Sequence, residues 1–176
     1  MTMGDLAEKL SYEKIQNLIE YRKSWGWLFY VFIPFKLLVT TSFTTSLMAI
    51  GVFVNSDKFQ FKSLFKVALI AQFVFLLPDV IKILWFSFVH TDYLLKDINE
   101  FYPLSLYSCF GLTAVESWLK YPLQNLNVFE FIYCIILYKN IEEIMPSNGI
   151  SAVASYLLGL LTWTILVMFL TLTYST

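Results

Sequence analysis

The chain has 176 residues, of which 58% are hydrophobic, 19% aromatic and only 14% charged. A soluble domain carries about a quarter charged residues, and one of this size has too small a core to bury so much apolar surface. The formal net charge of −1 also excludes the basic surplus on which nucleic-acid binding depends. The composition therefore predicts an integral membrane protein, with the lipid bilayer as its main solvent.

Residues 1–24 are predicted to form a separate N-terminal region, an amphipathic helix on the cytoplasmic side or at the membrane interface. Its apolar side chains recur at roughly helical spacing among charged ones: Leu6, Leu10, Ile15, Leu18 and Ile19. The segment leads into Trp25 and Trp27, and tryptophan is enriched at the level of the lipid headgroups. Two interpretations stay open, a helix lying on the membrane surface or a solvated helix packed on the protein's own loops.

Residues 25–176 are predicted to form an all-α, polytopic transmembrane bundle. Four apolar stretches, 25–54, 64–89, 121–138 and 150–174, are long enough to cross a hydrocarbon core of about 30 Å. Pro34 is expected to kink the first, and Pro78 is expected to free a backbone carbonyl at about Val74 in the second. The stretch 104–115 has 12 residues, too few to span, and predicts a re-entrant or interfacial helix. The polar residues 90–103 predict a loop or a short surface helix.

The distribution of basic residues predicts a cytoplasmic N-terminus. Lys9, Lys14, Arg22 and Lys23 precede the first span, although Lys58, Lys62 and Lys66 follow it. Four spans return the C-terminus to the same side.

Ionisable residues within the predicted spans are expected to form a polar cluster, because a lone charge is costly at the bilayer centre. Two are basic and two acidic, so the set is able to neutralise itself, and amides complete it by hydrogen bonds. The predicted cluster is Lys36, Gln72, Asp79, Lys82, Asn127 and Glu130. Its structural interpretation is a device that holds the helices in register; its functional interpretation is an ion, proton or substrate pathway.

Catalytic and metal-binding patterns are not found in the sequence. His90 is the single histidine and predicts an interfacial anchor, so no Ser–His–Asp triad can be assembled. Cys109 and Cys134 are predicted to be buried packing residues, since a metal site needs more ligands at closer spacing. Glu142 and Glu143 are adjacent and are interpreted as part of a solvated turn. We expect no cofactor and no enzymatic activity.

Three segments resemble bacterial members of the Yip family, named for proteins that interact with the Ypt and Rab GTPases. They are residues 61–86, 91–111 and 121–138, with the short phrases FYPLSL and LNVFE. The resemblance covers about residues 25–174 and implies a cytoplasmic N-terminus and a bundle of about five hydrophobic segments. The chain lacks the Asp-Leu-Tyr-Gly-Pro phrase that precedes the first span in eukaryotic members, so binding of a Rab-type GTPase is not expected.

The function predicted from the sequence is that of a scaffold or accessory subunit, acting through contacts with other membrane proteins or lipid. The bias toward Phe, Ile, Lys and Asn indicates a bacterial source and therefore the cytoplasmic (inner) membrane. The aromatic residues of the loop 90–122 are interpreted either as a docking face or as headgroup anchors: Tyr93, Phe101, Tyr102, Tyr107, Trp118 and Tyr121. The alternative function is a small ion, proton or solute transporter that uses the polar cluster.

Overall fold

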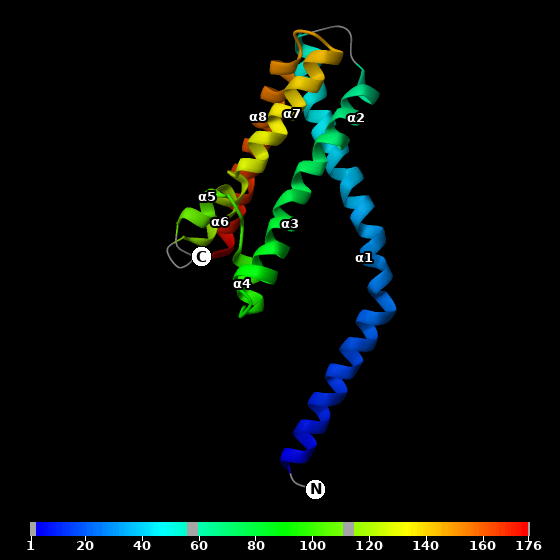
Figure 1. The fold of residues 1–176 in the computed structure, drawn as a ribbon, viewed down its shortest axis with the longest axis vertical. Helices are drawn as coiled ribbons and strands as arrows, with labels where there is room; N and C mark the ends of the chain where they lie inside the picture. Colours follow the sequence, from blue (N-terminus) through cyan, green and yellow to red (C-terminus); the bar gives the residue numbers. More distant parts are fainter. Residues whose placement is uncertain (1–2, 56–59, 111–114, 176) are drawn as a thin grey trace. The chain divides into compact units, whose positions relative to one another are not determined.

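A computed structural model describes residues 3–55, 60–110 and 115–175. Every regular element in these residues is helical (Figure 1). The chain divides into two units, Met1–Thr40 and Thr41–Thr176, each of which is described by itself.

Helix α1 (Met3–Asn55) has 53 residues and supplies the whole described part of the first unit. The helix continues without a break through the predicted domain boundary at residue 24 and through Pro34. All side chains from Tyr30 to Thr40 are exposed, as expected of a helix whose surroundings are apolar. The side chains of Leu6, Leu10, Ile15, Leu18 and Ile19 lie outside the described residues. The domain boundary and both interpretations of the N-terminal helix therefore stay predictions.

The second predicted span is a series of short helices. It contains α2 (Phe61–Ala71), the 3-10 helix η1 (Gln72–Phe75), α3 (Leu76–Leu84) and the π-helix η2 (Trp85–Val89). Pro78 explains the change at η1, because it has no N–H to donate to the carbonyl of Val74 and its ring crowds that carbonyl. The turn before Pro78 is therefore tightened into a 3-10 helix.

The remaining elements follow in the order α4 (Leu95–Glu100), α5 (Leu106–Cys109), α6 (Ser117–Asn125), α7 (Val128–Ile144) and α8 (Gly149–Ser175). Among the described residues, three helical stretches are long and apolar enough to cross a membrane: Lys23–Asn55, Phe61–Val89 and Gly149–Tyr174. Their bounds lie within three residues of the first, second and fourth predicted spans.

The third predicted span, 121–138, is misplaced. The chain leaves the helical path between α6 and α7, and α7 then continues to Ile144. The predicted helix over 104–115 is also too long, because α5 has only four residues and Phe110 is extended; residues 111–114 lie outside the described part.

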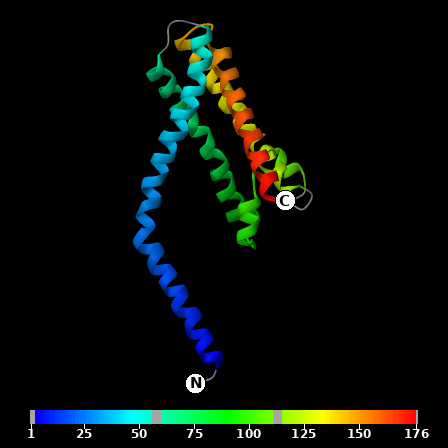
Figure 2. The ribbon, with the colours of Figure 1, turned by 180° about the vertical axis from the view of Figure 1, so that it is seen from behind.

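A single apolar core joins four elements of the second unit. The end of α1, α2, α7 and α8 gather in both views of the ribbon (Figures 1 and 2). Their buried side chains form one cluster: Met48, Val52, Leu64, Val67, Ala68, Ala71, Tyr133, Leu137, Ile141, Met145, Ala152 and Tyr156. The core holds α7 against α8 and so fixes the level at which their polar side chains meet.

Small residues allow α1 and α8 to pack in direct backbone contact. A Cβ atom added to Gly51 would lie 2.1 Å from the carbonyl oxygen of Ser151. Across the same contact, Ser155 Oγ donates to the carbonyl of Leu47 at 2.7 Å. Ser151, Ser155 and Gly159 follow one another at four-residue spacing, which places three small residues on one face of α8.

Candidate functional site

The two phrases that carry the Yip resemblance lie side by side. Leu106 N donates to the carbonyl of Leu126 at 2.9 Å, and Val128 N donates to the carbonyl of Leu104 at 3.1 Å. These bonds form an isolated antiparallel bridge between Ser105 and Asn127. The bridge ties the loop after the second span to the start of α7.

Asn127 is the N-cap of α7. Its Oδ1 accepts from the backbone N–H of Glu130 at 2.9 Å, and its Nδ2 donates to the carbonyls of Gln124 and Asn125. An N-cap side chain of this kind satisfies one of the free N–H groups at a helix start. Asn127 thus links the end of α6 to the start of α7 and fixes the orientation of the first turn of α7.

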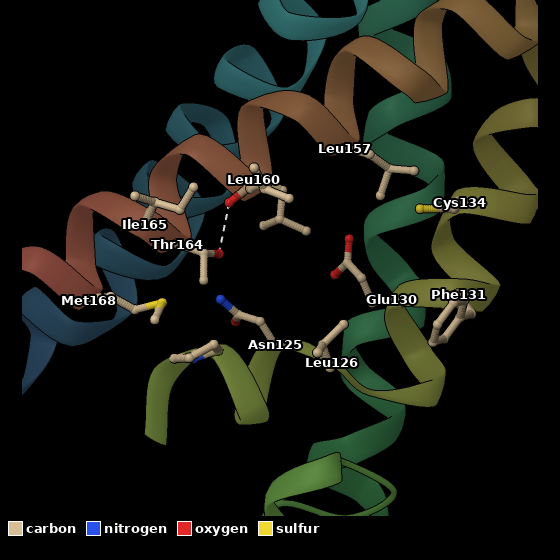
Figure 3. A pocket seen from close by; sticks show the side chains of 12 residues that line it. Asn125, Leu126, Glu130, Phe131, Cys134, Leu157, Leu160, Thr164, Ile165 and Met168 are labelled. Atoms are coloured by element: carbon tan, nitrogen blue, oxygen red, sulfur yellow. Dashed lines mark hydrogen bonds between the residues drawn. The ribbon is translucent and has the colours of Figure 1, made fainter. Parts of the chain in front are cut away.

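Glu130 lies in the first turn of α7, with its carboxylate directed toward α8 (Figure 3). Tyr156 Oη, from α8, donates to Glu130 Oε1 at 2.7 Å. The ring of Tyr156 packs against that of Tyr133, with 5.5 Å between centroids. The pair therefore joins α7 to α8 within the bundle.

A pocket of about 450 Å³ opens beside Glu130, between α6, α7 and α8. Its walls are almost entirely apolar; the polar side chains among them are Asn125, Glu130 and Thr164. Thr164 Oγ1 donates to the carbonyl of Leu160 in its own helix, the bond drawn in Figure 3. The remaining walls are Pro122, Leu126, Phe131, Cys134, Leu157, Leu160, Leu161, Ile165 and Met168.

Asn125 has an unmet hydrogen-bonding group at this site. Its Nδ2 atom is buried and has no hydrogen-bond partner among the described residues. The amide points into the pocket from the end of α6 (Figure 3). A second contact, from Trp163 Nε1 to Tyr121 Oη at 2.8 Å, holds α6 against α8 beside the pocket.

Within the second unit, the other members of the predicted cluster lie on other elements. Asp79 is exposed on α3, and no ion pair joins it to Lys82 in the part of the chain that the structure describes. Lys82 Nζ lies 6.0 Å from the ring centroid of Tyr102, a cation–π distance. Gln72 is half-buried in η1. Lys36 is exposed in the first unit, where its carbonyl accepts from Thr40, and its pairing stays a prediction.

The loop aromatics pack largely on one another. Buried Phe86, at the end of the second span, contacts Tyr93 and Phe101 with centroids 5.0 and 5.3 Å apart. Tyr107 is buried against Tyr102, at 5.7 Å. Since Tyr107 is enclosed, it belongs neither to a docking face nor to a set of headgroup anchors.

The structure also bears on the predictions for the two cysteines, for Glu142 and for His90. Cys109 is exposed and Cys134 half-buried, so the prediction that both are buried is wrong. Glu142 is not simply solvated: its two carboxylate oxygens accept from the backbone N–H groups of Ser147 and Gly149, at 2.9 and 3.0 Å. Exposed His90 follows η2 and packs edge-on against Phe86. In the described ranges no three His, Cys, Asp or Glu side chains gather as a metal site requires.

Comparisons with protein-family models, with curated proteins and with solved structures find no match to this chain.

Sequence reasoning missed Tyr156 and the role of Asn127. The pattern Asn127-x-x-Glu130 resembles a capping box and would have located the start of α7. Tyr156 lies in an uncharged apolar span, and its partner is determined by the register in which α7 packs against α8. No local pattern carries that information.

Proposed function

We propose that the chain is a four-span, non-enzymatic protein of the bacterial inner membrane, similar to Yip proteins, with a cytoplasmic N-terminus. It acts as a scaffold or accessory subunit, and its partners are lipid and other membrane proteins. The observation that carries the proposal is the extent of apolar surface left uncovered on the long helices. On α8, for example, Leu158 and Phe169 are 67% and 65% exposed.

Apolar side chains in such numbers need either acyl chains or the helices of another protein around them. Protein contact is favoured by the tight, small-residue packing already used within the bundle at Gly51.

The proposal is tested by placing a photoreactive amino acid at Leu158, Leu166 or Phe169 and irradiating native membranes. We expect all three positions to yield adducts with the same protein. Met48, which is completely buried, is the matched control and should yield no intermolecular adduct. Adducts with lipid alone at all three exposed positions would argue against the scaffold.

A small proton or solute transporter is the second candidate, because Glu130 is an ionisable residue at an intramembrane pocket. In proteoliposomes, we expect Glu130→Gln and Asp79→Asn to show the same proton and ion flux as the unchanged protein. That flux should not exceed the leak of protein-free vesicles. Flux that requires either carboxylate would make the transporter the leading function.

A further inference from the structure

The pocket between α6, α7 and α8 has an apolar and exposed rim. Phe131, Leu161 and Ile165 line it and are 65%, 57% and 57% exposed. Leu161 and Ile165 belong to Gly149–Tyr174, one of the three stretches apolar enough to cross a membrane. The open side of the pocket therefore faces acyl chains, and a molecule that enters it must dissolve in lipid.

The inner end of the pocket has the opposite chemistry. Glu130 Oε1 accepts from Tyr156, and its Oε2 has no hydrogen-bond partner within the described residues. Asn125 Nδ2 is buried and lacks an acceptor in the same part of the chain. Both side chains point into the cavity (Figure 3). One acceptor and one donor thus stand together in apolar surroundings, where leaving either group without a partner is unfavourable.

We propose that this pocket binds a lipid-soluble alcohol, an apolar molecule with a single hydroxyl head group. A hydroxyl donates one hydrogen bond and accepts others, so it satisfies Glu130 and Asn125 at once. The volume of about 450 Å³ lies within the range of about 300–1,000 Å³ found for small-molecule pockets.

Other head groups fit less well. An ammonium group donates to Glu130 but offers no acceptor to Asn125. A carboxylate accepts from Asn125 but has no hydrogen to donate to Glu130. A plain hydrocarbon chain leaves both groups without a partner. Of these four, the hydroxyl is the head group matched to the pair.

The test uses the full chain in lipid nanodiscs and a hexadecanol probe that carries a diazirine and an alkyne. Hexadecanol, hexadecylamine, hexadecanoate and hexadecane compete for photolabelling. We expect hexadecanol to compete most strongly and the label to fall on peptides of α7 and α8. Equal competition by hexadecane would overturn the proposal, since the pocket would then accept any acyl chain.

Two variants separate binding from folding. Asn125→Leu removes a donor that has no partner among the described residues, so the thermal midpoint of the unliganded protein should stay the same or rise. Affinity for hexadecanol should nevertheless fall about tenfold, the effect of losing one hydrogen bond in an apolar site. The control is Gln124→Leu, which also replaces a side-chain amide by leucine but lies one residue earlier and away from the pocket walls. It should alter neither quantity. Unchanged affinity in Asn125→Leu would refute the assignment of the head group.

A third variant checks the location. Leu161→Trp fills the pocket from its rim without touching Glu130 or Asn125, and it should abolish labelling while Tyr156 and Glu130 stay paired. Labelling that survives this change places the alcohol elsewhere and contradicts the proposal. The scaffold function is tested separately, by crosslinks from Leu158, Leu166 and Phe169, which do not line the pocket.

Discussion

Single polar side chains in this protein work mainly as connectors between helices. Glu130 joins α7 to α8 through Tyr156, Asn127 starts α7, and Glu142 joins the end of α7 to the start of α8. Each of them satisfies hydrogen-bonding groups that apolar surroundings would otherwise leave unmet. In a membrane protein with few polar residues, loss of any one of these connectors should therefore be visible in stability.

Glu142 provides the clearest test at this scale. We expect Glu142→Ala to lower the free energy of unfolding by about 2 kcal/mol, because two backbone N–H groups lose a charged acceptor. Glu142→Gln should have a smaller effect, since the amide oxygen still accepts one bond. Reversible unfolding in mixed micelles of detergent and SDS measures the change.

Glu143, the next residue in the chain, is the control for Glu142. Glu143 is exposed, and Glu143→Ala should change stability by less than about 0.5 kcal/mol. Similar losses in the two variants would mean that charge at the turn matters and the two hydrogen bonds do not.

Helices in this bundle meet where side chains are smallest. Gly51 allows the backbone of α1 to contact that of α8, and Ser155 adds a hydrogen bond across the contact. Close approach increases van der Waals contact, which stabilises helix pairs in lipid, where hydrophobic burial contributes little.

Three of the glycines in α1 and α8 should respond differently to a single methyl group. Gly51→Ala meets backbone atoms that cannot move aside, so we expect a loss of about 2–3 kcal/mol. Gly159→Ala meets only the flexible side chain of Leu47, with a loss below about 1 kcal/mol. Gly26→Ala meets nothing within 4 Å and should not destabilise the protein. The same unfolding assay ranks them, and a different order would contradict the close contact at Gly51.

Element positions were predictable from the sequence only where composition alone decides them. Three of the predicted spans coincide with long apolar helices, since about 20 apolar residues are a strong signal. The third span is misplaced because the apolar run 121–138 conceals the break before α7, where the Asn127 side chain is a helix cap. Of the predicted polar cluster, the structure brings Asn127 and Glu130 together, through a local bond between residues three apart.

The pocket could not be predicted from the sequence, for a different reason. It depends on the sideways placement of α6 against α8, where Trp163 Nε1 donates to Tyr121 Oη. Residues far apart in the chain find such contacts through tertiary packing, which a single sequence does not encode in any local pattern.

At the scale of the whole molecule, the number of membrane crossings follows from how α7 lies on α8. With 17 residues, α7 is about 26 Å long, at the lower limit for crossing a bilayer. A short turn and the shared core hold it antiparallel to α8, which is apolar enough to cross. We therefore expect the two helices to lie at the same depth in a membrane.

We accordingly expect four crossings, with both termini in the cytoplasm. Fusions of a cytoplasmic fluorescent reporter and of alkaline phosphatase to each terminus measure this directly. Fluorescence from both ends, without phosphatase activity, is the expected result. Termini on opposite sides would show that α7 does not cross and that the bundle has three spans.

The bridge between Ser105 and Asn127 also sets an order of events during synthesis. Residue 105 leaves the ribosome well before residue 127, so neither backbone hydrogen bond can form until the first turn of α7 has emerged. A nascent chain halted before that point has a loop anchored at one end only, and closing it later carries an entropic cost that grows with its length. Assembly of the C-terminal half is thus coupled to the arrival of α7, and a pause in translation once residue 128 has left the ribosome would give that closure time to occur.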